Sequence, residues 1–344
     1  MIDLRSDTIT RPTEPMRRAM YEAQVGDDVF FEDPTVNRLQ ERVAALLGKE
    51  RALWVASGTM GNLLSIKALT QPGEEVILET ENHIFVYEAA GSAVVSGVQL
   101  SPIQGKRGLI TRPQVEAAIR PADIHQPRTS VVVIENTHNR AGGAVIPLGE
   151  IERISELCQQ RGISMHMDGA RLLNAVVASG IEARRYAQHF DTVTICFSKG
   201  LGVPMGSMIA GSGAVMDRVH RFRKMIGGGQ RQVGIVAAAA LYALDHHVER
   251  LAEDHANAKR LAEALSMLPD VSVNPEEVDT NIVIFQVDPA RMSPTDVVVE
   301  MQKRAVLMFP FGPTNVRCVT HLDVSSDDIE AAIGAFSEVF KKGR

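Results

Sequence analysis

Four short apolar runs constrain the fold of this chain more than any other feature. They lie at 76–78, 131–134, 163–167 and Thr192–Cys196. These runs are rich in β-branched residues and do not alternate strictly between apolar and polar positions, and helical periodicity separates the later ones, as in Leu148–Arg161. A strand that is buried on both faces gives such an unbroken run. The pattern therefore predicts an α/β fold with a mainly parallel sheet between helices.

The predicted order of helices and strands changes near residue 250. Beyond it the pattern predicts a long helix at 248–268, strands at 281–287, 306–309 and 316–320, a helix at 295–304 and a last helix from Asp327. This mixture is typical of a smaller α+β unit. We therefore predict two domains, 1–250 and 251–344, which agrees with the usual domain size for a chain of 344 residues.

Charge and cysteine content narrow the class of protein. The chain has 36 Lys and Arg against 42 Asp and Glu, which argues against nucleic acid as a partner because phosphate binding requires concentrated basic residues. The three cysteines, Cys158, Cys196 and Cys318, are widely spaced and odd in number, as is typical of reduced thiols in the cytosol. We see no leader pattern and no long apolar run. We therefore expect a cytoplasmic protein that has no membrane contact and acts on a small molecule.

Two polar residues follow neighbouring predicted strands where those strands end. Asp168 follows one in H-M-D-G-A-R, and Lys199 follows the next in F-S-K-G-L-G. Ligands bind at the carboxyl ends of strands in open α/β sheets, so both side chains are expected at one site. Pyridoxal phosphate (PLP) chemistry needs a lysine that forms a Schiff base and a carboxylate that keeps the pyridine nitrogen protonated. A single Asp at a strand end is more often a helix cap, but the pair indicates a PLP site.

A candidate phosphate site precedes both residues. Ser57, Gly58 and Thr59 lie in A-S-G-T-M-G-N, directly before an apolar helical run at 63–69. Small residues let the backbone approach an anion at a helix N-terminus, where free N–H groups and the helix dipole favour negative charge. The alternative is an ordinary helix cap followed by a turn glycine. We assign no metal ligands.

Two histidines and a glycine-rich stretch are further candidates. His83 follows the first predicted strand and could lie flat on a pyridine ring, or be a partly exposed loop residue. His125 lies in P-A-D-I-H-Q-P-R-T, where a loop role is the stronger alternative. Three glycines at 227–229 stand between Lys224 and Arg231, so they form either a flexible turn or an anion contact, including one in a neighbouring subunit.

Several motifs together resemble one family. They are I-D-L-R-S-D-T-I-T-R-P-T, V-G-D-D-V, E-D-P-T-V-N, S-G-T-M-G-N, E-N-T-H-N, H-M-D-G-A-R, S-K-G-L-G, G-G-G-Q-R-Q and R-C-V-T-H-L-D-V-S. Over nearly its whole length the chain is similar to the low-specificity L-threonine aldolases. These are PLP enzymes of fold type I, the aspartate-aminotransferase fold, and they are grouped with the β-eliminating lyases. The resemblance implies a large PLP-binding domain, a smaller C-terminal α+β domain and a homotetramer built from dimers that share active sites.

The resemblance also implies which residues hold the cofactor. Lys199 would be the Schiff-base lysine, Asp168 would pair with the pyridine nitrogen, and His83 would stack on the ring. Arg231 would reach the phosphate from a partner subunit. The phosphate would otherwise be held by Ser57, Gly58 and Thr59.

A second set of implied roles concerns the amino-acid substrate. Ser6 and Arg317 would hold its carboxylate, since a bidentate guanidinium suits that group. Arg171 would contact both this carboxylate and the cofactor O3′. His125 would lie close to the substrate side chain, and a water positioned by His83 and His125 is our preferred base. The implied reaction cleaves L-threonine or L-allo-threonine between Cα and Cβ to give glycine and an aldehyde.

Several positions depart from the family pattern and leave the substrate open. Phe30 and Phe31 stand where Tyr-Gly is usual, Gln126 replaces an aromatic residue, Gln230 replaces a methionine, and 308–313 is unusually aromatic and proline-rich. If the two phenylalanines line the mouth of the site, they favour a bulkier β-substituent. Their alternative is simple core or subunit packing. The other functional readings are β-elimination, racemisation or transamination by the same cofactor, or a cofactor-binding protein without catalysis.

Overall fold

A seven-stranded sheet forms the centre of the computed structural model, which describes residues 1–341. In spatial order its strands are β2 (Arg51–Val55), β8 (Ser207–Gly211), β7 (Thr192–Cys196), β6 (Ser164–Gly169), β5 (Thr129–Glu135), β3 (Glu75–Glu79) and β4 (Gln99–Ile103). Of the strands described in this sheet, only β8 runs opposite to the other six. The predicted mainly parallel sheet is therefore confirmed, and the structure adds β2, β4 and β8 to the four predicted strands.

Both faces of the sheet are apolar, which explains why its strands do not alternate in sequence. In β5, Val132 and Ile134 point into the largest hydrophobic cluster, whereas Val131 and Val133 point into a cluster on the opposite face. Successive side chains of a strand project to opposite faces. A strand covered on both faces can therefore be apolar at successive positions, as β5 is at 131–134.

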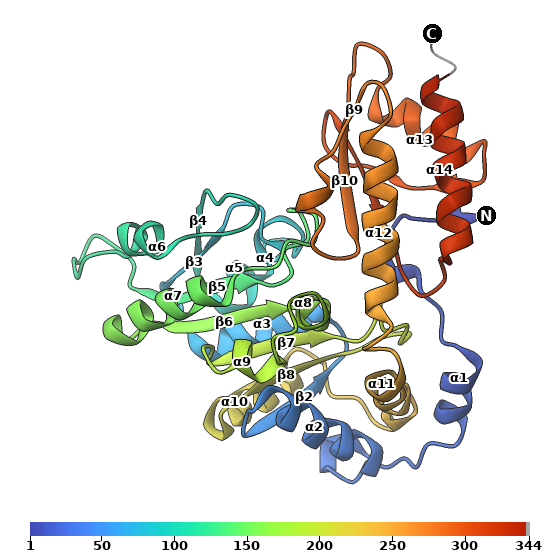
Figure 1. The fold of residues 1–344 in the computed structure, drawn as a ribbon. Helices are drawn as coiled ribbons and strands as arrows, with labels where there is room; N and C mark the ends of the chain where they lie inside the picture. The colour runs from blue at the N-terminus through green and yellow to red at the C-terminus, as the bar shows by residue number, and fades with distance from the viewer. Residues whose placement is uncertain (342–344) are drawn as a thin grey trace.

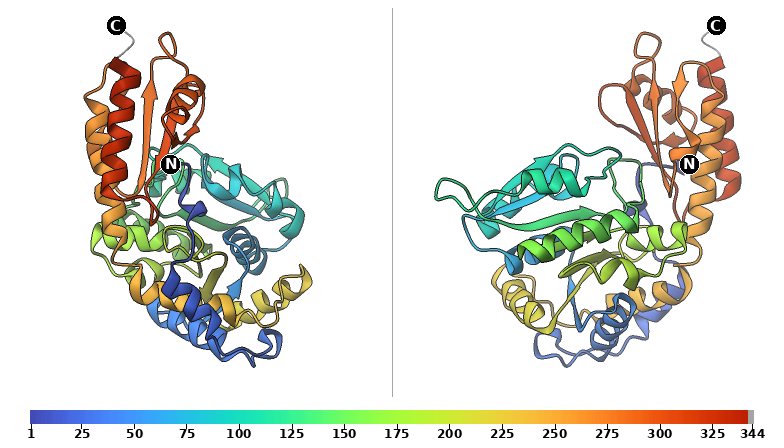
Figure 2. Two further views of the ribbon diagram at one scale, coloured as in Figure 1. Left: turned by 90° about the vertical axis from the view of Figure 1, so that its right-hand side faces the viewer. Right: turned by 60° about the vertical axis from the view of Figure 1, so that its left-hand side comes forward.

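Helices cover the two faces as separate layers (Figures 1 and 2). One layer, whose residues enter the largest cluster, contains α2 (Pro34–Leu47), α7 (Leu148–Arg161), α8 (Leu172–Ser179), α9 (Ala183–Ala187) and α11 (Gly234–His246). The other contains α3 (Gly58–Leu69), α5 (Gly91–Ser96) and α10 (Gly213–Met225). The remaining helices of this part are α1 (Glu14–Tyr21), α4 (His83–Val86), α6 (Arg112–Ala118), η1 (Asp7–Ile9) and η2 (Asp28–Phe30).

A smaller unit stands beside one end of this layered body (Figures 1 and 2). Its sheet is antiparallel, in the order β12 (Phe309–Pro310), β13 (Asn315–Val319), β10 (Ile282–Val287) and β9 (Val271–Ser272). Its helices are α12 (Leu251–Ser266), η3 (Pro275–Glu277), α13 (Pro294–Gln302) and α14 (Ser326–Lys341). The unit is α+β, as expected, and the boundary at residue 250 stays a prediction. Residues 342–344 of the predicted second domain lie outside the described residues.

Two elements of the smaller unit differ from the sequence prediction. The helix expected at 248–268 begins only at Leu251, because the chain turns between α11 and α12. The strand expected at 306–309 is two strands with different partners: β11 (Val306–Leu307) pairs with β1 (Ile2–Asp3), whereas β12 pairs with β13. A change of partner within four residues leaves no trace in apolar periodicity.

The N-terminal arm joins both parts of the molecule (Figure 1). Strand β1 runs parallel to β11, and Leu4 is fully buried in the hydrophobic cluster of the smaller unit. The arm then crosses to the large sheet, where Met16 of α1 enters the largest cluster. The first residues of the chain therefore pass between the two units at the edge where the functional side chains gather.

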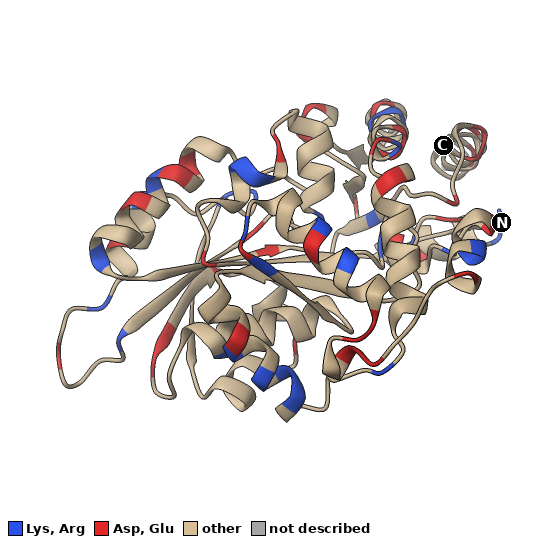
Figure 3. Cartoon of the chain, turned by 90° about the horizontal axis from the view of Figure 1, so that it is seen from below, with Lys and Arg blue, Asp and Glu red and all other residues tan. Residues whose placement is uncertain are grey.

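Charged residues of both signs mix on the surface. In Figure 3, which shows the chain from below, Lys and Arg are interspersed with Asp and Glu along the helices. Within residues 1–341, no helix is long and apolar enough to cross a bilayer.

Candidate active site

The predicted site residues meet at the carboxyl edge of the central sheet. Glu135 at the end of β5 is in register with Asp168 at the end of β6. Lys199 follows the end of β7 by three residues. Its backbone oxygen accepts hydrogen bonds from the Thr10 hydroxyl at 2.8 Å and from the Gly202 N–H at 2.9 Å. The arm and the turn after β7 therefore hold this lysine at the edge.

Asp168 is a buried carboxylate that stays ionised. Its side chain accepts from Asn62 Nδ2 at 2.8 Å and from the Ala170 N–H at 3.1 Å. Burial by itself would raise the pKa of Asp168, but the charges of His83 and Lys199 hold it below its usual range. The carboxylate is thus poised to face a positive group.

Asn62 and His166 extend this network, and the sequence analysis assigned neither of them a role. Asn62 Oδ1 lies 3.1 Å from His166 Nε2, and His166 Nδ1 lies 2.9 Å from Thr192 Oγ1. Both residues lie in motifs quoted above, Asn62 in S-G-T-M-G-N and His166 in H-M-D-G-A-R. Residues 166 and 168 share one face of β6, and residue 62 follows residue 58 by one helical turn.

Burial lowers the pKa of His166 to about 4, and this makes stability depend on pH. Between pH 6.5 and about 4, His166 is protonated in the unfolded chain but neutral in the native protein. The free energy of unfolding therefore falls by about 1.4 kcal/mol for each pH unit of acidification in this range. We expect His166→Gln to remove this contribution, which amounts to about 3 kcal/mol over the whole window. Urea unfolding at a series of pH values measures it. Parallel curves for the two proteins would contradict the assignment, since His255, whose pKa burial also lowers to about 4, is present in both.

The first turn of α3 forms a cradle for an anion. Ser57 caps the helix by accepting from the Met60 N–H at 3.2 Å, as expected for a helix N-terminus. A Cβ added to Gly58 would lie 2.6 Å from Cys196 Sγ, so the absence of a side chain lets this turn pack against the end of β7. The dipole and N–H groups of α3 point at the edge that holds Lys199.

The glycine-rich stretch lies against this cradle. A Cβ on Gly228 would come within 2.8 Å of Met60 Sδ in the same helical turn. Arg231 pairs with Asp27 at 2.9 Å, and its side chain is 55% exposed. The structure thus places Arg231 on the surface next to this stretch, where it can face another molecule, and Lys224 is also exposed.

His83 begins α4 beside Asp168. Its backbone N–H donates to Glu135 Oε2 at 2.7 Å, and its Nδ1 lies 3.0 Å from Glu88 Oε1. Burial opposes protonation of the ring, but the hydrogen bond to Glu88 and the charge of Asp168 raise the pKa of His83. Glu88 is fully buried and also accepts from Asn62 at 2.8 Å. No signal in the sequence distinguished this glutamate.

A second cluster of charges faces the site from the arm and the smaller unit. Arg171 donates to both oxygens of Asp7, each at 2.7 Å, and both side chains are buried. Ser6 lies next to Asp7 and accepts from the Thr8 N–H at 3.2 Å. Arg317 is on β13, and its buried Nε has no hydrogen-bond partner among the described residues. A buried guanidinium N–H without a partner favours a ligand carboxylate.

His125 is not brought to this site within one chain. It lies in the loop before β5, at the opposite end of that strand from Glu135, and its side chain is 81% exposed against Asp123. Within one chain His125 therefore lies apart from the other predicted residues, and its role at a site shared between subunits stays a prediction. The alternative given in the sequence analysis, that His125 is a loop residue, agrees with this placement.

Phe31 also lies away from the mouth of the site in its own chain. It lines a hollow with Glu50 and Arg51, and Arg51 is level with Thr192 at the amino end of β7. Core packing is equally wrong, since Phe30 is 66% and Phe31 45% exposed. Packing against another subunit stays a prediction.

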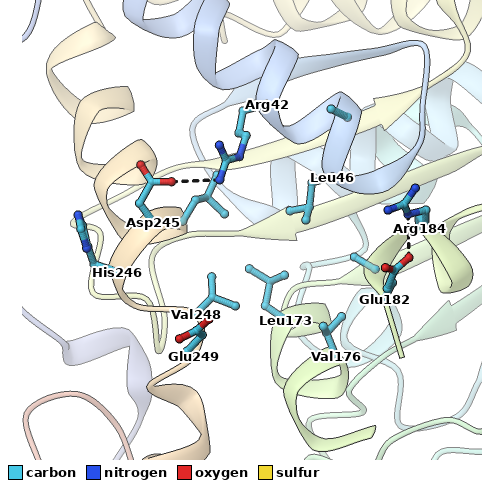
Figure 4. A pocket seen from close by; sticks show the side chains of 13 residues that line it. Arg42, Leu46, Leu173, Val176, Glu182, Arg184, Asp245, His246, Val248 and Glu249 are labelled. Atoms are coloured by element: carbon cyan, nitrogen blue, oxygen red, sulfur yellow. Dashed lines mark hydrogen bonds and ion pairs between the residues drawn. The ribbon is translucent and has the colours of Figure 1, made fainter. Parts of the chain in front are cut away.

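A separate pocket of about 390 Å³ lies between α2, α8, α9 and the end of α11 (Figure 4). Leu46, Leu173, Val176 and Val248 form its apolar part, and the ion pair Arg42–Asp245 stands at its rim. It contains none of the predicted site residues.

Solved structures with this architecture define its class. The chain superposes on a threonine aldolase from Leishmania major with a TM-score of 0.83 at 18% identity, covering 99% of both chains. It superposes on a structure of SPT with PLP with a TM-score of 0.75 at 16% identity, covering 99% of this chain and 88% of that chain. The fold is that of the fold type I PLP enzymes.

Sequence comparison narrows this class to one family. Residues 3–288 match the beta-eliminating lyase model. The chain is 42% identical over 330 residues to the low specificity L-threonine aldolase of Escherichia coli K12, covering 96% of each. It is 36% identical to the alanine racemase TOXG of Cochliobolus carbonum, covering 98% of this chain and 87% of that protein. The chain belongs to the beta-eliminating lyase family.

Proposed function

We propose that this protein is a PLP-dependent aldolase that cleaves L-threonine and L-allo-threonine to glycine and acetaldehyde. One observation carries the proposal: Lys199, the ionised Asp168 and the anion cradle of α3 share one edge of the sheet. The Escherichia coli relative, similar over nearly the whole chain, is a threonine aldolase by name. The experiment that tests the proposal is a product assay for glycine and aldehyde with both threonine epimers.

The residues present fit PLP. The cradle at Ser57, Gly58 and Thr59 suits a phosphate, because a side chain at Gly58 would displace Cys196 from the base of that turn. Asp168 suits a protonated ring nitrogen, and Lys199 suits the aldehyde carbon. When bound, the cofactor supplies an electron sink for the pair of electrons released at Cα.

The other side chains bind and orient the amino acid. The buried Nε–H of Arg317 has no partner among the described residues and can donate to the carboxylate. Ser6 lies next to Asp7 in the N-terminal arm, and Asp7 holds Arg171 in place. His83 covers the ring. Because its Nδ1 is held by Glu88, Nε2 is left to accept a proton directly or through a water.

Two groups are assigned to a neighbouring subunit. We propose that Arg231 reaches the phosphate and His125 reaches the substrate side chain of a partner, in a homotetramer. Their exposure supports this, since both side chains lie on the surface, where a second subunit can meet them. Gel filtration with light scattering tests the assembly, and a monomer with full activity would contradict it.

Loose control at Cβ is expected of such a site. The carboxylate contacts at Arg317 and Arg171 fix the L configuration, whereas a water held by His83 and His125 can serve either hydroxyl epimer. Rejection is strong only when a buried polar group loses its partner. We expect kcat/KM for L-threonine and L-allo-threonine to differ by less than about a hundredfold, with no cleavage of the D-enantiomers. A larger ratio would contradict loose control, and cleavage of D-threonine would contradict the carboxylate contacts.

Racemisation is the second candidate, and the similarity to an alanine racemase favours it. Both reactions start from the same bound amino acid and differ in the bond at Cα that breaks. Incubation with L-alanine in deuterium oxide, followed by chiral chromatography, separates them. Formation of deuterated D-alanine from L-alanine, together with no release of aldehyde from threonine, would overturn the aldolase proposal in favour of racemisation.

We also propose a cytoplasmic location. Cys158, Cys196 and Cys318 are all buried and unpaired, which suits a reducing compartment. Burial raises the pKa of the Cys158 and Cys318 thiols to about 12, so these two are unreactive. Cell fractionation with an antibody to the protein tests the location.

A further inference from the structure

The aromatic stretch at 308–313 lies against the arginines that border the site. Phe309 on β12 is in register with Arg317, and the chain turns after Pro310 so that the Phe311 N–H donates to the Asn315 oxygen at 2.7 Å. The Phe311 ring lies under two guanidinium groups, with Arg140 Cζ at 4.7 Å and Arg317 Cζ at 5.8 Å from its centroid. This phenylalanine thus links an arginine of the large unit to the unpaired arginine of the smaller one.

The two arginines differ in what else they bind. Arg140 is fixed by an ion pair with Glu81 and a hydrogen bond to the Tyr87 hydroxyl at 2.7 Å. Arg317 has no ion pair among residues 1–341, although Asp7 is near enough to act on its charge. Burial, and then the like charge of Arg171, lowers the pKa of Arg317 to about 10. Arg140 therefore anchors the ring, and the ring is the partner that remains for Arg317.

An aromatic face holds a guanidinium without using its hydrogen bonds. A cation over a ring is attracted by the ring quadrupole, while the N–H donors stay in the guanidinium plane. A carboxylate at position 311 would hold Arg317 as well, but it would occupy the fork that a ligand carboxylate needs. The ring fixes the arginine and leaves its in-plane N–H donors available.

We propose that Phe311 is a positioning residue that holds Arg317 ready for the α-carboxylate of the amino acid. The inference rests on the proposed function only in taking an α-amino acid as the ligand. It extends that function by assigning a role to the stretch in which this chain departs from its family. Phe311 acts through Arg317 and need not touch the substrate itself.

The test compares Phe311→Leu with Phe222→Leu in the holoenzyme. Phe222 of α10 makes the same kind of contact to a different cation, Lys67 Nζ at 5.8 Å, and it belongs to another part of the fold, so it is a matched control. We expect Phe311→Leu to weaken glycine binding about fivefold to tenfold, the scale of one cation–π contact. KM for L-threonine should rise by more than kcat falls. Phe222→Leu should bind glycine as the wild type does, and Phe311→Trp, which keeps a ring face, should restore binding.

A ligand without a carboxylate separates positioning from general damage. Binding of 1-aminopropan-2-ol, which is threonine without its carboxylate, should change less than twofold in Phe311→Leu. In an Arg317→Lys background, Phe311→Leu should also cost less than twofold, because two residues that act through one contact are not additive. Equal losses for both ligands, or a full loss in the Arg317→Lys background, would overturn the proposal.

The outcome is independent of the aldolase assignment. If the wild type binds glycine but does not cleave threonine, the proposed function fails while the comparison of glycine affinities still decides the role of Phe311. If the Leu variant does not fold, Phe311→Met takes its place, since it also removes the ring. Unchanged glycine affinity in the folded variant would overturn the inference whatever the reaction.

Discussion

Lys199→Ala is expected to lower kcat for L-threonine by at least about 10³-fold, the scale of losing a positioned proton-transfer group. The loss should be local, because Thr10 and Gly202 bond to the backbone of residue 199 and its side chain takes no part in the core. Absorbance of the bound cofactor and the unfolding transition, recorded together, separate lost chemistry from lost structure.

Borohydride reduction of the wild type gives the direct readout for this lysine. Peptide mapping should find the cofactor fixed to Lys199 and to no other residue. Lys67→Ala on α3 is the control, because it removes a lysine amine that lies over the Phe222 ring and has no proposed role at the site. A label on Lys224, the exposed lysine near the glycine-rich stretch, would move the site.

The second large effect is expected for Asp168→Asn. The variant keeps the shape of the side chain but loses the charge that the surrounding His83 and Lys199 stabilise. Fixed charges aimed at developing charge contribute about 3 kcal/mol, so kcat should fall about a hundredfold. The affinity for PLP, measured by titration of the apoprotein, should change less.

A surface carboxylate provides the control for this variant. Asp217 is 71% exposed and pairs with Arg51, so Asp217→Asn should leave kcat unchanged. Unchanged kcat in Asp168→Asn would mean that another group protonates the ring. Glu88 is then the residue to replace, since it shares the Asn62 amide with Asp168.

Sequence periodicity predicted the parts of the fold that are buried on both faces. The bounds of α7 are those expected, because this helix ends at Gly162, a glycine with positive φ. Strands that pair over long distances gave weaker signals. β11 and β12 share one short run of sequence, and only their partners, β1 and β13, separate them.

The candidate site was predictable where one side chain carries one chemical role. Asp168 and Lys199 follow strand ends, and strand ends converge. Glu88 and Asp7 were missed because they act on other protein groups, His83 and Arg171. Such contacts depend on where loops return in space, which no spacing encodes. His125 is a different case, because it lies on the surface of its own chain and its proposed role depends on a neighbouring subunit.

The N-terminal arm has a consequence for the order in which the molecule is made. Ile2 pairs with Val306, so the first strand waits for a partner that is synthesised some three hundred residues later. Asp7 and Arg171 are both synthesised well before residue 306. Until β1 pairs with β11, however, that pairing cannot hold the arm in the position that places Asp7 beside Arg171. Closing so long a loop is slow relative to local helix and strand formation. We therefore expect nascent chains that end before residue 306 to form the central sheet and yet lack an ordered carboxylate site, so that competence to bind an amino acid arrives last.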